Sequence, residues 1–275
     1  VFPNSVRKIE EYAFSGCKFL KKITIPDSVE SISYYAFNNC SYLEELKMNP
    51  YKTKIEKTSF TKCSKLEVFI YPETIDRIAP YDFKNLPHIK KIIILGNISI
   101  IEPRSFYECK SIIEIQIPST VEVIGSHSFY SCSSLKKINI NISENIKKIE
   151  ESLFYGCSSL KHIELPANIE SIESSAFKEC TSLKQINFPD SLEQIKNQAF
   201  YNCCNLSRIE FSPNSKLQKI FDEAFYSCKL LQNIQFPSLL QEIGMKAFSE
   251  NILLSEISIP PSVDLIGEKA FERCS

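Results

Sequence analysis

The sequence of 275 residues lacks tryptophan, has only six glycines and contains no run of eighteen apolar residues. Without such a run there is no signal for a transmembrane helix, so we expect no membrane insertion by this segment. No G-x-S-x-G, P-loop or G-x-G-x-x-G motif occurs, and six glycines are too few for a phosphate-cradling loop. These absences argue against the common hydrolase and nucleotide-binding classes.

A charge excess of one sign is also missing. The chain has 32 lysines and arginines against 33 acidic residues, which gives a formal net charge of −1. No strong overall field therefore draws it to nucleic acid, and we expect no nucleic-acid partner. The composition, with 43% hydrophobic and 24% charged residues, is that of a globular chain.

Metal and catalytic constellations are missing as well. The three histidines, His88, His127 and His162, are scattered, and neither H-E-x-x-H nor C-x-x-C occurs. Acidic pairs occupy solvent positions of the repeat described below and do not converge on one site, as a sugar-acting enzyme would require. We therefore expect no cofactor, no metal and no enzymatic activity.

What the sequence does have is an internal repeat. Phenylalanine recurs every 23 residues, with two spacings of 25, at positions 14, 37, 60, 83, 106, 129, 154, 177, 200, 225, 248 and 271. Cysteine follows three residues later in ten units, and Leu86 and Asn251 are the exceptions. Six residues after the phenylalanine comes Leu or Ile, and nine residues after it comes Ile in most units. The eleventh residue after it is apolar, and proline often follows that residue.

This pattern predicts a solenoid, because one unit of 23 residues cannot bury its apolar face alone. The alternating stretch before proline predicts a strand, and a later pair such as Val29 and Ile32 suggests a second short extended piece. Phe and Cys three apart suit one face of a helical turn. We therefore predict an α/β repeat solenoid of the leucine-rich-repeat type, with a parallel sheet on one side and short helical turns on the other.

The repeat covers residues 1–275 as a single domain of about 12 units. Both ends fall inside a unit, so we expect a segment cut from a longer protein, with possible end-to-end self-association of its uncapped ends. Two repeats each contain two extra residues, within 141–145 and 212–216. We expect these segments to bulge outward, because Ile146 and Leu217 return to the repeat positions that point into the core. The repeated cysteines are interpreted as buried free thiols that act as small hydrophobes, with Cys204 off the pattern and more exposed.

The stretch Ile25-Pro26-Asp27-Ser28-Val29, continued by Ile32, Ala36-Phe37, Cys40, Leu43 and Leu46, resembles the BspA-like (Treponema pallidum-type) leucine-rich repeats. The resemblance covers the whole chain. It implies a surface protein of a bacterium or a parasitic protist such as Trichomonas or Entamoeba, with relatives linked to adhesion and to binding of host or matrix proteins.

We therefore expect a non-enzymatic protein-binding module at the cell surface or outside the cell. The alternative is an intracellular, cytoplasmic scaffold or regulatory repeat protein that uses the same sheet. Among the outward strand positions, apolar residues gather only in two adjacent strands, and a mildly basic run lies near the middle of the chain. The candidate protein-binding residues are Val68, Ile70, Lys90, Lys91, Ile93, Lys137 and Lys161. Two interpretations of the apolar group stay open, an exposed contact site or a surface covered by a neighbouring irregular loop.

A row of tyrosines follows the repeated phenylalanine in several units. It has two readings, stacking between neighbouring units or an aromatic contact surface.

Overall fold

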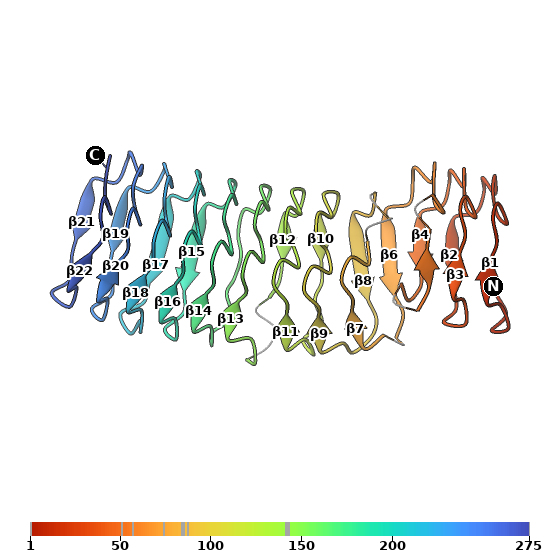
Figure 1. Cartoon of the computed structure of the whole chain (residues 1–275), viewed down its shortest axis with the longest axis horizontal. Coiled ribbons are helices and arrows are strands. Elements are labelled where there is room, and N and C mark those ends of the chain that lie inside the picture. Colours follow the sequence, from red (N-terminus) through yellow and green to blue (C-terminus); the bar gives the residue numbers. More distant parts are fainter. Residues whose placement is uncertain are drawn as a thin grey trace.

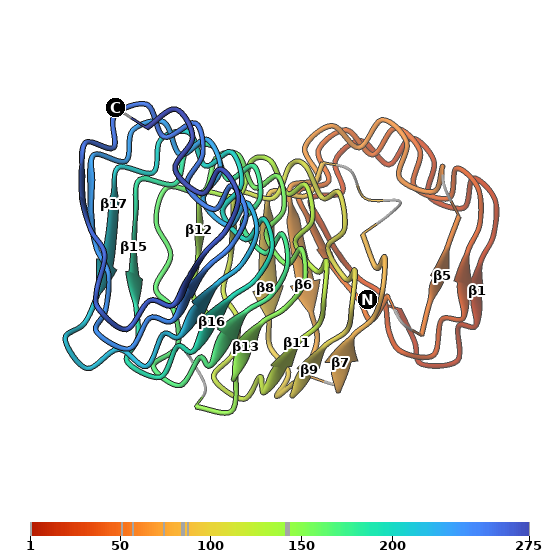
Figure 2. The ribbon, with the colours of Figure 1, turned by 60° about the vertical axis from the view of Figure 1, so that its left-hand side comes forward.

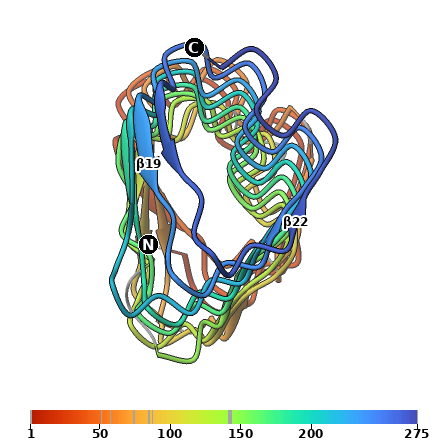
Figure 3. The ribbon, with the colours of Figure 1, turned by 90° about the vertical axis from the view of Figure 1, so that its left-hand side faces the viewer.

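In the computed structural model the chain winds as a stack of coils, one per repeat, with the first and last coils at opposite ends (Figure 1). The structure describes residues 2–50, 52–56, 58–73, 75–83, 86, 88–140 and 144–274. Viewed along the stack, the strands lie on the two flanks of the coils and turns close the remaining side (Figure 3). All strand pairs in the described residues are parallel, as expected when equivalent segments of successive coils lie side by side.

The main sheet consists of the strands that precede the proline position. It comes in three hydrogen-bonded groups, the first with six strands and the others with two each. These strands are β2 (Lys22–Thr24), β4 (Glu45–Lys47), β6 (Val68–Tyr71), β8 (Lys91–Ile94), β10 (Glu114–Ile115) and β12 (Lys137–Ile138), then β15 (Gln185–Phe188) with β17 (Arg208–Phe211), and β19 (Asn233–Gln235) with β21 (Glu256–Ser258). Their side chains alternate between the core and the outer face, as in β15.

A second sheet runs along the opposite flank, where several of its strands lie side by side in Figure 2. The second extended piece predicted from the Val-x-x-Ile pairs is thus confirmed. Its groups are β1 (Lys8–Ile9), β3 (Ser31–Ile32) and β5 (Lys54–Ile55); β7 (Arg77–Ile78), β9 (Ile100–Ile101) and β11 (Val123–Ile124); and β13 (Lys148–Ile149), β14 (Ser171–Ile172), β16 (Gln194–Ile195), β18 (Lys219–Ile220), β20 (Glu242–Ile243) and β22 (Leu265–Ile266).

The prediction of helical turns is wrong, since the described residues contain no helix. In most coils the residue two before and the residue two after the repeated phenylalanine adopt left-handed backbone angles. Around Phe37 these are Tyr35 (φ 56°) and Asn39 (φ 58°). A left-handed residue every fourth position prevents a right-handed helix from continuing. The segment instead forms turns that hydrogen-bond to the next coil, for example from Phe37 N–H to the Ser59 carbonyl at 2.8 Å.

The core is one continuous column of the repeated positions. Rings such as Phe129, Phe177 and Phe200 have no exposed surface. Phe177 and Phe200 stack with their ring centroids 5.0 Å apart, and Phe200 and Phe225 do the same. Burial of this column across coils supplies the hydrophobic stabilisation that one repeat cannot provide.

The two longer repeats keep the core in phase, as predicted, because Ile146 and Leu217 are buried. Residues 141–143 of the first insertion lie outside the described residues. After each insertion, however, the main sheet is interrupted: β12 ends the first group, and β17 and β19 belong to different groups. The sequence interpretation did not include this consequence.

No helix in the described part of the chain is long and apolar enough to cross a bilayer.

Candidate functional site

The outer face of the main sheet presents the apolar group predicted from sequence. Ile70 in β6 and Ile93 in β8 are register partners, so their side chains are neighbours on one face of the sheet. Both are half-buried, and so is Val68. Complete coverage by a loop, one of the two interpretations left open above, would have buried these side chains. The described residues therefore leave part of each side chain accessible.

Leu95 extends this group, and the sequence interpretation missed it. It follows β8 directly, two residues beyond Ile93, and 42% of it is exposed. The signal was present in the period-2 alternation of the strand, which continues one position further than the repeat pattern indicates. We call Val68, Ile70, Ile93 and Leu95 the apolar patch.

The two lysines at the edge of the apolar patch are paired with acids of neighbouring coils. Lys90 Nζ lies 2.5 Å from Glu67 Oε1, and Lys91 Nζ lies 3.8 Å from Glu114 Oε1. Both pairs are about half exposed, so each contributes little to stability. Their effect is to neutralise charge at the rim of the apolar patch.

Lys137 and Lys161 lie elsewhere on the face, beyond β10. They line an open cavity of about 720 Å³ at the interruption that follows the first insertion. Lys136, His162 and Glu164 contribute to the same walls. The seven predicted residues therefore form two separate places on one face: the apolar patch with its paired lysines, and a lysine-lined groove.

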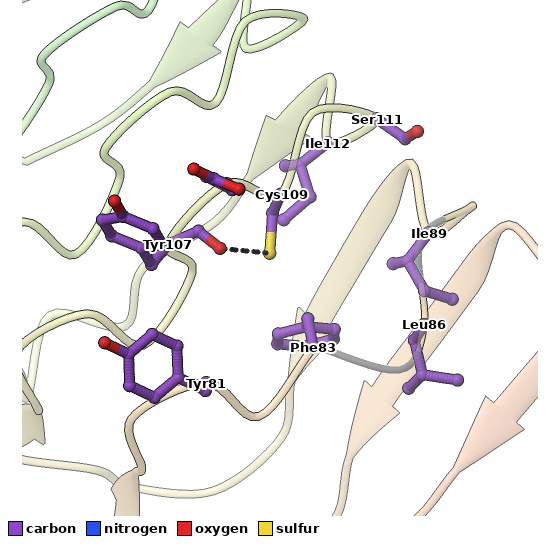
Figure 4. Close-up of a pocket in the computed structure, with 9 residues that line it drawn as sticks. Tyr81, Phe83, Leu86, Ile89, Tyr107, Cys109, Ser111 and Ile112 are labelled. Carbon is purple, nitrogen blue, oxygen red and sulfur yellow. Dashed lines mark hydrogen bonds between the residues drawn. The ribbon is translucent and has the colours of Figure 1, made fainter. Parts of the chain in front are cut away.

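A smaller cavity of about 440 Å³ opens on the turn side, where the repeat is irregular. Figure 4 shows Tyr81 and Tyr107 on one wall, Leu86 and Ile89 on another, and Phe83 and the Cys109 thiol between them. Burial raises the pKa of Cys109 to about 12, so the thiol stays neutral and is a poor nucleophile. The cavity offers apolar surface and no activated group.

The cysteines at the repeated position do more than fill space. In the regular coils each thiol donates a hydrogen bond to the carbonyl of the phenylalanine one coil earlier, as Cys180 Sγ does to Phe154 O at 3.1 Å. Burial raises the pKa of Cys180 well above its usual value, which keeps the proton on this donor. Sequence reasoning identified the burial and missed the hydrogen bond.

The expectation that all these cysteines are buried is wrong at three places, since Cys17 is exposed and both Cys109 and the terminal Cys274 are half-buried. Cys17 is exposed because it lies in the first coil, where no earlier coil of the described chain covers it. Cys109 is half-buried, and its thiol lies 4.0 Å from the Tyr107 carbonyl of its own coil. One coil earlier Leu86, whose side chain has no donor, occupies the cysteine position and is buried.

Asp82 is a carboxyl group inside the wall of the solenoid, close to Leu86 in the sequence. It accepts hydrogen bonds from the Tyr71 hydroxyl at 2.9 Å and from the Ala79 N–H at 3.1 Å. Desolvation raises its pKa to about 7, and these two hydrogen bonds offset only part of that effect. No group of three or more His, Cys, Asp or Glu side chains placed to hold a metal occurs in the part of the chain that the structure describes.

The tyrosine row stacks between coils, which confirms the first of its two readings. The ring centroids of Tyr107 and Tyr130 are 4.9 Å apart, and those of Tyr130 and Tyr155 are 4.6 Å apart. Lys178 continues the row, since its Nζ lies 4.5 Å from the centroid of Tyr201 and 5.9 Å from that of Tyr155. This cation–π bridge joins two tyrosine stacks that the sequence pattern leaves separate.

Comparison with known families gives one clear match. The family model described as "BspA type Leucine rich repeat region (6 copies)" matches residues 1–112, 77–203 and 147–275. No curated protein matches this chain.

Several solved structures are similar to the chain. A leucine rich cell surface protein from Faecalibacterium prausnitzii is 27% identical, with a TM-score of 0.52, over 99% of this chain and 75% of that one. The pneumococcal vaccine antigen PcpA is 18% identical, with a TM-score of 0.52, over 97% of this chain and 72% of that one. A leucine rich repeat protein of T. pallidum is 22% identical over 69% of this chain and 78% of that one, with a TM-score of 0.35.

Proposed function

Because the chain belongs to the BspA-type leucine-rich repeat family, we propose that it is a non-enzymatic protein-binding module of a cell-surface, adhesin-like protein. Its ligand would be a host protein, a matrix protein or a protein on another cell. The similarity to a bacterial cell-surface protein that is 27% identical supports the location. Leucine-rich repeat solenoids serve as binding scaffolds, in which a rigid sheet presents many outward side chains.

The observation that carries this proposal is the apolar patch. Its three strand residues, Val68, Ile70 and Ile93, are half-buried aliphatic side chains on a sheet whose other outward positions are mostly polar or charged. Leu95 adds a fourth, 42% exposed. A contiguous apolar group with a polar rim has the composition of an interface centre, because its burial against a partner removes apolar area from water.

The test is the double variant Ile70→Ser with Ile93→Ser, assayed for binding to cultured host cells and to immobilised extracellular-matrix proteins. We expect binding to fall at least tenfold while the melting temperature changes little. The matched control is Ile100→Ser with Val123→Ser, two exposed register partners on the second sheet. Equal loss in both variants, or unchanged binding in the first, would contradict a ligand site at the apolar patch.

Location is tested separately, by staining unpermeabilised cells that express the full-length protein with an antibody to this region. A surface signal supports the adhesin-like role. A signal only after permeabilisation would favour an intracellular scaffold.

A further inference from the structure

The groove beside β12 has a structural cause in the length of its repeat. The main sheet stops at β12, and the next segment, Lys161–Glu164, is not part of a strand. The cavity of about 720 Å³ opens there and spans three successive coils, with Glu114, Lys137 and Lys161 contributed one from each. The insertion at 141–145 begins three residues after β12 ends, so the groove lies where the longer repeat meets its neighbour.

The second longer repeat reproduces this arrangement. Its insertion at 212–216 follows β17, and the hydrogen-bonded group again ends there. A cavity of about 500 Å³ opens between β17 and β19, lined by Arg208, Glu210 and Asn233 among others. Two insertions at the same point of the repeat thus produce two grooves on the same face.

The two grooves differ in charge. At the second, Arg208 is paired with Glu210 within its own strand. At the first, Lys136, Lys137 and Lys161 are exposed and make no ion pair with any described residue. The acids in its walls lie near other groups, Glu114 at 3.8 Å from Lys91 and Glu164 at 3.8 Å from His162 Nε2, and both acids keep about half or more of their side chain exposed.

Within the described strands of the main sheet, Lys137 is the one lysine without an acidic neighbour, whereas Lys22 lies 2.7 Å from Glu45 and Lys47 lies 3.7 Å from Glu73. Unpaired lysines also occur just before the strands, at Lys21 and Lys184, but the groove brings Lys137 together with Lys136 and Lys161. A cluster of three unneutralised cations therefore presents complementary charge to an anionic partner.

We propose that this lysine groove binds a short, extended, acidic peptide segment of the protein partner, an inference that rests on the protein-binding function proposed above. Three coils about 4.8 Å apart give the groove a length of roughly three to four extended residues. The floor is aliphatic, with Ile138 and Ile163, so an apolar residue between the acidic ones fits it.

The acids at both ends of the groove favour a short acidic peptide over a long polyanion. Glu114 and Glu164 flank the lysines, so a long uniform polyanion such as a nucleic acid or a sulfated polysaccharide would meet negative charge on either side. A peptide with two or three carboxylates places its charge only where the lysines are. The overall net charge of −1 adds no general attraction for polyanions.

The experiment measures fluorescence anisotropy of a labelled octapeptide, Gly-Ser-Asp-Leu-Glu-Asp-Ser-Gly, against the same peptide with Asn and Gln in place of its acids. The wild-type chain should bind the acidic peptide and not the amide peptide, and the affinity should fall as salt screens the lysines. Lys137→Gln with Lys161→Gln should weaken binding at least tenfold. The control, Lys22→Gln with Lys47→Gln, removes the same charge from the same face and should change affinity less than twofold.

Three outcomes would overturn the inference: no wild-type binding of the acidic peptide, equal loss in the test and control variants, or tighter lysine-dependent binding of heparin or a single-stranded oligonucleotide than of the peptide. Binding of the same variants to cells and matrix proteins separates this inference from the proposed function. If Ile70→Ser with Ile93→Ser abolishes that binding while the peptide does not bind, the function stands and the lysine groove is wrong.

Discussion

At the scale of single residues, the hydrogen bond between coils explains which substitutions the cysteine position accepts. Asn251 replaces cysteine there and has no exposed surface. Its amide Nδ2 donates to the Phe225 carbonyl at 2.9 Å and to the Phe248 carbonyl at 2.6 Å. The position thus requires a small buried donor, which either a thiol or an amide can supply. Leucine at 86 supplies no donor.

Asn251 therefore gives a direct test of the donor. We expect Asn251→Leu to lower the free energy of unfolding by about 1–3 kcal/mol, because the Phe225 carbonyl loses the amide donor and, among the described donors, the Phe248 carbonyl keeps only the Cys274 thiol at 3.2 Å. Asn251→Cys should be neutral or stabilising, since it keeps a donor and removes Oδ1, a buried atom without a hydrogen-bond partner in the described structure. Urea unfolding of the three proteins measures this. Equal stability of the Leu variant and the wild type would show that only packing matters at this position.

Asp82 predicts a pH dependence with a definite sign. Its pKa rises from about 4 in an unfolded chain to about 7 in the folded one, so the folded state holds the proton more tightly. Stability from this residue is therefore fully present below pH 4, is lost as the pH rises to about 7, and is constant above that.

The variant Asp82→Asn isolates this effect, because it is similar in shape and does not ionise. Relative to this variant, the wild type should lose on the order of 2 kcal/mol between pH 4.5 and pH 8, after allowance for partial solvent access. Urea unfolding at both pH values supplies the comparison, in which titration of the other carboxyl groups largely cancels. A difference that does not change with pH would mean that Asp82 is ionised in the folded chain at both values.

At the scale of elements, the strands could be predicted and the turns could not. The inward isoleucines and the proline positions define each strand, because burial on one face imposes the period-2 pattern. The left-handed positions carry no such pattern. Two residues before phenylalanine the chain has Tyr35, Arg104 and Glu223, all at positive φ and none of them glycine. Hydrogen bonds between coils hold this geometry, so the preference of the single residue is overridden and the sequence signal is lost.

The left-handed geometry predicts how a turn position responds to substitution. Ser175 has φ of 57°, and its N–H donates to the Asn197 carbonyl at 2.9 Å. Ser175→Val should cost about 1–2 kcal/mol, because a β-branched side chain disfavours this backbone region, whereas Ser175→Gly should not. Ser174→Val, at the adjacent position without positive φ, is the control and should stay within about 0.5 kcal/mol. Thermal denaturation measures all three, and equal losses at 174 and 175 would refute the backbone explanation.

The candidate site was predictable in part for the same reason. Alternation along β6 and β8 identified Val68, Ile70 and Ile93 as outward residues, and their register follows from the constant 23-residue spacing. The groove could not be predicted, because it depends on where hydrogen bonding between coils fails. From sequence the two insertions were expected only to bulge outward and to leave the core positions unchanged. That expectation is correct for the core, but it does not include the interruption of the main sheet.

At the scale of the whole molecule, the first insertion divides the solenoid. The main sheet ends at β12 and the second sheet ends a group at β11, so both flanks are interrupted between the same two coils. The turn side continues across: Phe129 N–H donates to the Leu153 carbonyl at 3.0 Å, and Cys157 Sγ donates to Phe129 O at 3.1 Å. The rings of Phe129 and Phe154 also stack, at 5.6 Å. Among the described residues, backbone hydrogen bonds between the two blocks therefore lie on the turn side, while the buried core continues across and Asn145 Nδ2 donates to Glu122 Oε1 at 3.3 Å.

Because strand pairing is interrupted on both flanks there, we expect the two blocks to open locally, with the turn side as a hinge, which would widen the lysine groove. Native-state hydrogen exchange tests this. Amides of residues 160–165, whose segment belongs to no strand, should exchange at least tenfold faster than those of residues 89–94, where β8 is paired on both sides. Amides of residues 153–157, on the turn side of the same coil, should stay protected. If the turn side exchanged together with residues 160–165, the coil would be unfolding as a unit and the hinge would be wrong. Protection of residues 160–165 equal to that of 89–94 would mean that the two blocks form one continuous sheet in solution.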